Sequence, residues 1–211
     1  MLEALLGALS ETLYMVFFAT LFSSIGGFGL AIFLILTGPH GLRPRPGIYA
    51  ALDAVVNLLR SFPFMILMIA LIPFTRTVAG VAYGSTAAIV PLTVAAIPFM
   101  ARLVEGSLLE VDPGVVEAAR SFGASDGQII FQVMVREAMP SIVLNVAVLA
   151  IALLGYSAMA GAIGGGGLGA LAYNEGYIRF RADMMLGAVA VLILVVQCIQ
   201  ICGNRIYKKL R

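Results

Sequence analysis

Charged side chains are scarce in this sequence. Only 13 Lys and Arg and 11 Asp and Glu stand among 211 residues, of which 61% are hydrophobic. A mean hydropathy of +1.04 excludes an ordinary water-soluble domain and favours a membrane protein with several spans. No basic cluster is interleaved with aromatic residues, so nucleic-acid binding is excluded as well. The length suits one membrane bundle, and we expect residues 1–211 to form a single transmembrane domain.

Cysteine and histidine are also nearly absent. Cys198 and Cys202 lie four residues apart in an apolar run without further metal ligands nearby. We therefore interpret them as lipid- or helix-facing small residues and expect no metal site. The first apolar run is preceded by Glu3 and Glu11 and by no Lys or Arg, so it does not resemble a cleaved signal peptide.

Long charge-free stretches predict an all-α polytopic bundle of five membrane helices, because each span needs about 20 apolar residues. The expected spans lie within Thr12–Thr37, from near Val55 through Ser61–Thr75, within Thr77–Ala101 from about Ser85, within Ala138–Ile163 and within Met184–Gly203. An odd number of spans puts the two ends of the chain on opposite sides. Four prolines inside the second and third spans are kinks that packed membrane helices tolerate. These are Pro63, Pro73, Pro91 and Pro98.

Basic residues predict the orientation. The tail "RIYKKLR" carries Arg205, Lys208, Lys209 and Arg211 and no acid, which indicates a cytoplasmic C-terminus. Alternation then places ten basic residues inside, among them those of the loop from Arg102 to Arg136, and three outside. The N-terminus is expected outside. Arg60 is counted near the inner end of the second span, where it can snorkel to the interface, and a path-lining or inter-helix role is the alternative.

The longest cytoplasmic segment, about residues 109–138, predicts two short helices joined by a sharp turn. Asp112 is a good N-cap, and Pro113 suits the first helical position. Gly123 is placed to end this helix in a left-handed conformation. Ser125 and Gln128 have the spacing of a capping box, which starts the second helix.

The first of these helices is amphipathic. Val115, Ala118, Ala119 and Phe122 repeat at helical spacing on one face, with Glu117 on another. Such a face can dock in a groove of a partner protein. The alternative is a helix that lies flat on the bilayer, although acidic residues disfavour an anionic leaflet.

The stretch "EAARSFGASDGQIIFQVMVREAMP" resembles the EAA loop of ABC-importer permeases. Glu117, Ala118, Ala119 and Gly123 match its pattern, whereas Arg136 stands where the family usually has Pro. The segments "NLLRSFPFMILMIALIPFTR", "AAIVPLTVAAIPFMARLVEGSLLEV" and "GYSAMAGAIGGGGLG" are similar to the five-span methionine-importer permeases of the type I class. The likeness covers the chain from the first span onward.

The resemblance implies a homodimer in a bacterial inner membrane that imports L-methionine, D-methionine or close analogues by alternating access. In that family the EAA loop is a coupling helix that seats in a cleft of the cytoplasmic ABC ATPase, of which the assembly has two subunits, and an external binding protein delivers the cargo. Val115 and Phe122 would join the EAA residues in this contact. ATP and Mg²⁺ are expected on the ATPase, because this chain has no phosphate-binding motif of its own. Another small amino acid or polar solute is the alternative cargo.

Small residues concentrate in "SSIGGFG" (Ser23–Gly29) and near the end of the fourth span, where they allow close helix packing. Tyr156, Ser157 and Met159 are our candidates for the translocation path or its gate, with ordinary packing as the alternative. The run Gly164–Gly167 lacks the strand and helix of a phosphate-binding loop and predicts a flexible outer connection.

Two other functional classes compete with an importer. An intramembrane serine enzyme would need Ser157 to meet His40, the only histidine, yet the two are expected on opposite sides of the membrane. No span holds a carboxylate pair for aspartate chemistry, so no catalytic residue is expected. A channel would have no use for a docking helix.

Overall fold

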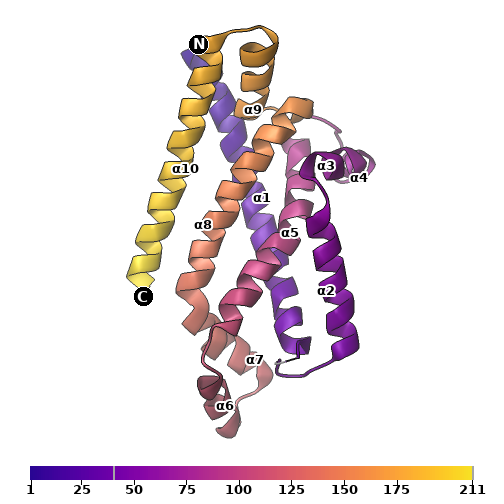
Figure 1. Ribbon diagram of the computed structural model, residues 1–211, viewed down its shortest axis with the longest axis vertical. Helices are drawn as coiled ribbons and strands as arrows, with labels where there is room; N and C mark the ends of the chain where they lie inside the picture. The colour runs from indigo at the N-terminus through magenta and orange to yellow at the C-terminus, as the bar shows by residue number, and fades with distance from the viewer. Residues whose placement is uncertain (40, 211) are drawn as a thin grey trace.

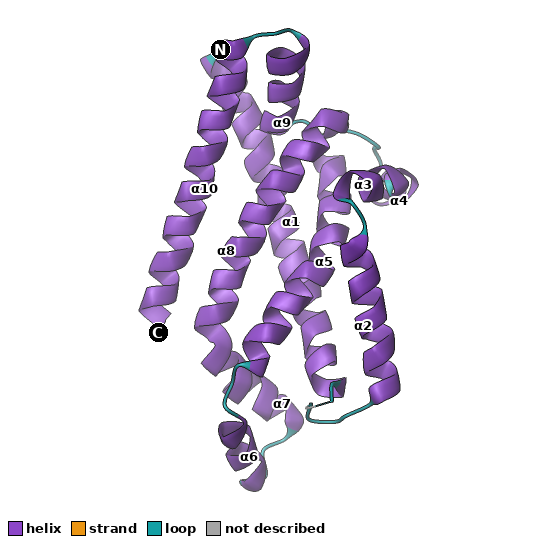
Figure 2. Ribbon diagram, viewed as in Figure 1, coloured by secondary structure: helices purple, strands orange, loops and turns teal. Residues whose placement is uncertain are grey.

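Helices make up the fold in the computed structural model, which describes residues 1–39 and 41–210 (Figures 1 and 2). His40 and Arg211, both used in the sequence argument, lie outside the described residues. The helices, in chain order, are α1 (Leu2–Thr37), α2 (Pro46–Ser61), α3 (Phe64–Ala70), α4 (Ile72–Ala79), α5 (Ser85–Leu109), α6 (Pro113–Ser121), α7 (Asp126–Gln128), η1 (Ile129–Met134), α8 (Val135–Ala160), η2 (Gly161–Gly165), α9 (Gly167–Leu171), η3 (Ala172–Ile178) and α10 (Ala182–Leu210).

The chain passes along the bundle five times. By length and composition, α1, α5, α10 and the continuous helix Asp126–Gly165 can each cross a membrane, and the bent pair α2–α3 makes the fifth span. The first residue lies at one end of the bundle, α6 lies at the other, and α10 runs toward the α6 end (Figure 1). Four of the predicted spans are confirmed, and the fifth is present when the bent pair α2–α3 is counted as one span. Chain ends on opposite sides of the membrane remain a prediction. Which end is cytoplasmic remains a prediction.

The second span differs from its prediction, because it is broken rather than merely kinked. Its first helix, α2, begins at Pro46 rather than near Val55 and ends at Ser61. The chain then turns by 102° into α3. Pro63 explains the break: its ring disfavours helical backbone at the preceding residue, and Phe62 is extended with φ −72° and ψ 129°. Pro73, expected as a kink, instead stands in the first turn of α4, where proline is tolerated.

Helix α5 begins at Ser85, as predicted, but runs eight residues beyond Ala101 to Leu109. Arg102 and Glu105 therefore belong to a helix of the bundle and not to a cytoplasmic loop, which corrects the sequence reading. Pro91 and Pro98 both lie inside α5. The charge pattern misplaced this boundary because two charged residues appeared to end the apolar run.

Close packing of α1 on α5 depends on the glycines of "SSIGGFG". A Cβ added at Gly27 would lie 2.6 Å from Met100 Cβ and 2.9 Å from the Ile97 carbonyl oxygen. Distances this short are not tolerated, so only glycine lets the two helices approach here. At Gly29 a Cβ would meet nothing within 4 Å. The buried core beside this contact is built mainly from α1, α5 and α8.

The glycine run after α8 is tied to the bundle, not free as the sequence suggested. The Gly167 N–H donates to Glu11 Oε2 at 2.7 Å, and the Leu168 N–H donates to Thr12 Oγ1 at 2.8 Å. Gly164 and Gly166 have φ values of 97° and 80°, which suit glycine. Contrary to the sequence reading, a short helix, α9, does follow the run, and α1 supplies the acceptors for its first N–H groups.

Candidate functional site

The loop helix α6 forms as the sequence predicts. The Asp112 carboxylate accepts a hydrogen bond of 2.7 Å from the Gly114 N–H, and Pro113 stands in the first turn. Gly123 has φ 80°, the left-handed conformation expected of it. The capping box is also present, with Ser125 and Gln128 bonding each other's backbone N–H. The local chemistry of these residues therefore sets both helix boundaries.

The apolar face of α6 is divided between the protein's own core and solvent. Phe122 is 92% exposed, and Val115 and Ala118 are also exposed. Ala119, which the sequence placed on the same docking face, is half-buried and packs with Val116 against the core. The surface open to a partner is thus narrower than expected. Glu117 is exposed beside it.

Two contacts hold α6 and α7 to the turn between α1 and α2. Arg120 Nη2 donates to the Leu42 carbonyl oxygen at 2.9 Å. Arg43 and Asp126 form an ion pair at the start of α7. From α7 the helix continues without interruption through η1 into α8. Arg136 lies within α8 with an exposed side chain, so the backbone stays helical where the family usually has Pro. A displacement of α6 would accordingly be transmitted to α2 and α8.

The three candidate path residues have different surroundings. Met159 is 47% exposed, and Gly155 and Val148 lie on the same open face of α8. Tyr156 stacks on Phe64 of α3 with ring centroids 4.8 Å apart. Ser157 is buried, and its Oγ donates to the Leu154 carbonyl oxygen at 2.8 Å. Met159 is therefore available to line a path, whereas Ser157 contributes to packing. Because the Ser157 hydroxyl already donates to a backbone carbonyl oxygen, the serine-enzyme alternative is also disfavoured.

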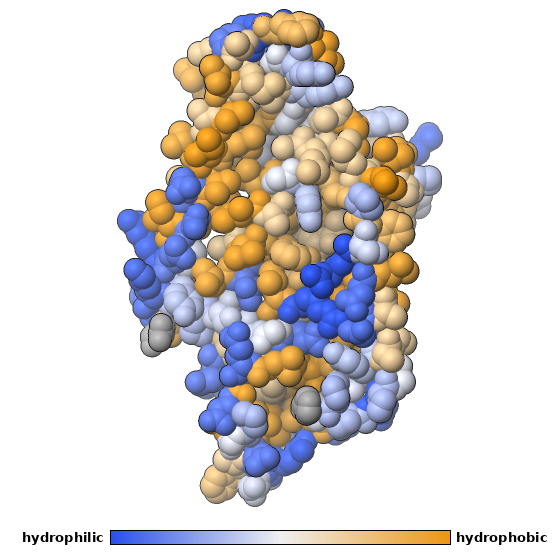
Figure 3. Space-filling model, viewed as in Figure 1, coloured by the Kyte–Doolittle hydropathy of each residue, from blue (hydrophilic) through white to orange (hydrophobic). Residues whose placement is uncertain are grey.

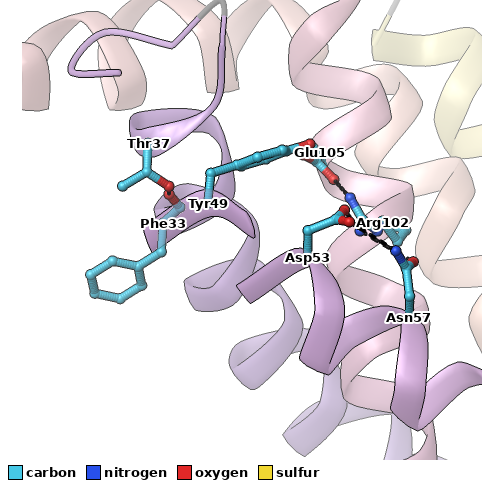
Figure 4. Close-up of polar contacts among 7 residues, drawn as sticks. All are labelled: Phe33, Thr37, Tyr49, Asp53, Asn57, Arg102 and Glu105. Atoms are coloured by element: carbon cyan, nitrogen blue, oxygen red, sulfur yellow. Dashed lines mark hydrogen bonds and ion pairs between the residues drawn. The ribbon is translucent and has the colours of Figure 1, made fainter. Parts of the chain in front are cut away.

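A polar network that the sequence reading missed joins α2 to α5 (Figure 4). Arg102 Nη1 donates to Glu105 Oε2 at 2.7 Å, and Arg102 Nη2 pairs with Asp53 of α2. Asn57 Nδ2 donates to Asp53 Oδ2 at 3.0 Å. Tyr49 Oη and Glu105 Oε1 are 3.5 Å apart. The spacing of Asp53 and Asn57 on one helix was the available signal, but their partners come from a helix that was predicted to have ended.

Arg60 also lies elsewhere than predicted. Because α2 begins at Pro46, Arg60 stands in its last turn, about 21 Å along the helix at 1.5 Å per residue. The side chain is exposed. Snorkelling to the inner interface, the role preferred from the sequence, does not fit this position. The alternative role, lining a path or a helix contact, is the one that the geometry favours.

The opposite face of α8 is apolar. A cavity of about 490 Å³ lies between α1, α8 and α10, and a second of about 450 Å³ adjoins it. Val146, Ala150 and Ile199 line both, and the free, exposed Cys198 and Cys202 line the second. At 100° per residue Val146 and Ala150 point about 140–180° away from Val148, Gly155 and Met159. This side fits lipid chains, as the sequence expected for the two cysteines.

Metal chemistry finds no support within residues 1–39 and 41–210, where no three His, Cys, Asp or Glu side chains cluster. His40 lies outside the described residues. What the site offers is an exposed amphipathic helix at one end, an open α8 face with a flexible thioether, and a charged network between α2 and α5.

Comparison with known proteins places the chain among importers. Residues 27–211 match the family described as binding-protein-dependent transport system inner membrane component. The chain is 46% identical over 207 residues to a probable D-methionine transport system permease protein MetI of Vibrio cholerae, covering 98% of this chain and 92% of the relative. It is 45% identical over 205 residues to the methionine import system permease protein MetP of Bacillus subtilis, covering 97% of this chain and 92% of the relative.

Solved structures agree with these sequence relatives. A structure described as inward-facing conformations of the MetNI methionine ABC transporter superposes with a TM-score of 0.98 at 41% identity, covering 100% of this chain and 98% of that one. An amino acid ABC transporter superposes with a TM-score of 0.80 at 20% identity, covering 98% of this chain and 94% of that one. This likeness shows the fold alone.

Proposed function

The chain belongs to the family of binding-protein-dependent transport system inner membrane components, and from this premise we propose that it carries methionine into the cell. It is a membrane-spanning permease of an ABC importer with the type I fold, and a transport subunit, not an enzyme. The observation that supports methionine as the substrate is whole-length similarity to two permeases named for methionine or D-methionine transport. Both L- and D-methionine are therefore proposed substrates.

The proposed partners fit the exposed surfaces of the chain. A second copy of the chain covers the open α8 face, so that two Met159 side chains approach across the path. Two cytoplasmic ABC ATPase subunits bind ATP and Mg²⁺, and each contacts Val115, Ala118 and Phe122 of α6 in one copy of the chain, with Glu117 at the rim. An external binding protein delivers the cargo at the opposite end. The exposure of Phe122 supports the ATPase contact, because an isolated loop helix gains nothing from a phenyl ring in water.

The orientation is proposed from charge. The end that carries α6 holds Arg43, Arg120, Lys208 and Lys209, so it faces the cytoplasm of a bacterial inner membrane. The N-terminus then lies outside. This arrangement presents α6 to the cytoplasmic ATPase, as the coupling role requires.

Transport in vesicles tests the proposed cargo. The permease, reconstituted with its ATPase and binding protein, should accumulate labelled methionine with ATP and should not do so with a non-hydrolysable analogue. Competition by unlabelled L- and D-methionine then reports stereoselectivity. Robust uptake of a sugar or an inorganic anion, with none of methionine, contradicts the proposal.

A further inference from the structure

Four polar side chains form a ledge part-way along α2 and α5. Asp53, Asn57 and Arg60 follow one another at i, i+4 and i+7, so they share one face of α2, and Arg102 of α5 lies against it. We call these four residues the polar ledge. Arg102 stands seven residues, about 10 Å, before the inner end of α5, and Arg60 lies about 10 Å farther along than Asp53. The ledge therefore reaches toward the middle of the bundle.

The ledge lies open on the surface of the single chain. Figure 3 shows a strongly hydrophilic patch over α2, bordered by hydrophobic residues. Asn57 and Arg60 are exposed, and Asp53 and Arg102 are partly exposed. Charged groups within the hydrocarbon region are costly unless they face a bundle interior or a water-filled cavity. A polar face of this kind fits the border of a water-filled path, whereas the apolar cavities between α1, α8 and α10 fit lipid chains.

Charge is distributed unevenly along the ledge. The carboxylates of Asp53 and Glu105 share the single guanidinium of Arg102, which leaves one net negative charge in this network. Asn57 extends it, donating to Asp53 and accepting from Arg102 Nη2 at 3.3 Å. Arg60 adds a positive charge less than one turn beyond Asn57. Within residues 1–39 and 41–210 we find no ion pair or side-chain hydrogen bond to Arg60. One end of the ledge is thus negative and the other positive.

We propose that the polar ledge is a transient binding site for the zwitterionic backbone of an α-amino acid on its way through the path. Arg60 binds the carboxylate, and the side-chain oxygens of Asp53 and Asn57 hold the ammonium group. The inference rests on the proposed importer function and assigns a site to it.

Apolar surface lies next to Arg60 and suits an apolar cargo side chain. Phe62, two residues beyond Arg60 at the end of α2, is 45% exposed. A thioether makes favourable contacts with aromatic ring edges, so this exposed ring offers a place for a methionine side chain. Arg102 already pairs with the carboxylates of Asp53 and Glu105. Few hydrogen-bonding groups of the polar ledge are therefore left unpaired when the cargo leaves. Weak binding is what release into the cytoplasm requires.

Cysteine protection tests the site without relying on transport. Ser61 is exposed, lies next to Arg60 and within 40° of Asn57 on α2, and tolerates the near-isosteric change Ser61→Cys. In a Cys198→Ala, Cys202→Ala background, the permease with its ATPase is reconstituted without binding protein and treated with a small charged thiol reagent. Methionine should slow labelling of Ser61→Cys, whereas methionine methyl ester and N-acetylmethionine, which are not zwitterions, should not. A reporter at Ser10→Cys, exposed near the outer end of α1, should show no protection.

Arg60→Gln then separates recognition from packing. Loss of one hydrogen bond to a charged group should weaken protection about tenfold, and Arg60→Lys should restore part of it. Arg76→Gln, which removes the same charge from an exposed position on α4, should leave protection unchanged. Any of three results contradicts the proposed binding site: equal protection by the methyl ester, protection that survives Arg60→Gln, or no protection by methionine. Methionine uptake by the unaltered complex would still support the importer, so the two claims fail separately.

Discussion

The Glu11 carboxylate of α1 accepts a hydrogen bond of 2.7 Å from the backbone N–H of Gly167, 156 residues farther along the chain. This contact joins the N-terminal half of α1 to the start of α9. A carboxylate at a helix N-terminus satisfies an otherwise unpaired N–H. It also brings the glycine run so close to α1 that a Cβ at Gly166 would lie 2.6 Å from Glu11 Oε2.

Glu11→Gln should lower the free energy of unfolding by about 1 kcal/mol, because the amide is a weaker acceptor for that N–H. Thermal unfolding of the purified protein in detergent measures the change. Glu3→Gln is the matched control, since Glu3 is exposed in the first turn of α1 and makes no such contact among the described residues. Equal effects of the two substitutions would show that the Glu11 contact does not stabilise the fold.

Gly27→Val should destabilise the bundle by about 1–3 kcal/mol, because the added side chain must displace Met100 and separate α1 from α5. The same unfolding assay applies. Gly29→Ala should be nearly neutral, since a Cβ there meets nothing within 4 Å. A Gly27→Val protein as stable as the unsubstituted one would mean that the helices do not cross at this glycine.

Arg102→Ala should cost about 3 kcal/mol, because it leaves the buried Glu105 carboxylate without a counter-charge. Adding Glu105→Gln to that variant should recover a large part of the loss, since the remaining buried group is then neutral. A double-mutant cycle on unfolding free energies measures this coupling. Additive losses would contradict an Arg102–Glu105 interaction.

Sequence patterns predicted the local structure of α6 well, because its boundaries depend on residues within a few positions of each other. Asp112, Gly123 and the Ser125–Gln128 box act through the nearby backbone, so their roles could be read directly. Arg102 and Arg60 were misplaced because a charge was taken to mark a membrane boundary. In the structure Arg102 is neutralised by Asp53, from a different helix, and that pairing depends on tertiary packing. The inward turn of Ala119 likewise depends on how α6 rests against the core.

The orientation can be measured with single cysteines. In a Cys198→Ala, Cys202→Ala background, Glu3→Cys should react with an impermeant thiol reagent added to intact cells, whereas Lys209→Cys should react only after lysis. The basic residues at the α6 end determine this expectation. Labelling of position 209 alone in intact cells would reverse the orientation.

Coupling through α6 is the central claim, and Phe122 tests it most directly. Its ring is 92% exposed, so Phe122→Ala should leave the permease folded and its unfolding temperature unchanged. Phe180 is 88% exposed at the opposite end of the molecule, and Phe180→Ala provides the matched control. The measurement is the Kd of the purified permease for its ATPase. We expect Phe122→Ala to raise it about tenfold to a hundredfold, as loss of an interface anchor does, and Phe180→Ala to leave it unchanged. An unchanged Kd for Phe122→Ala, with normal ATP-driven uptake, would contradict a coupling role for α6.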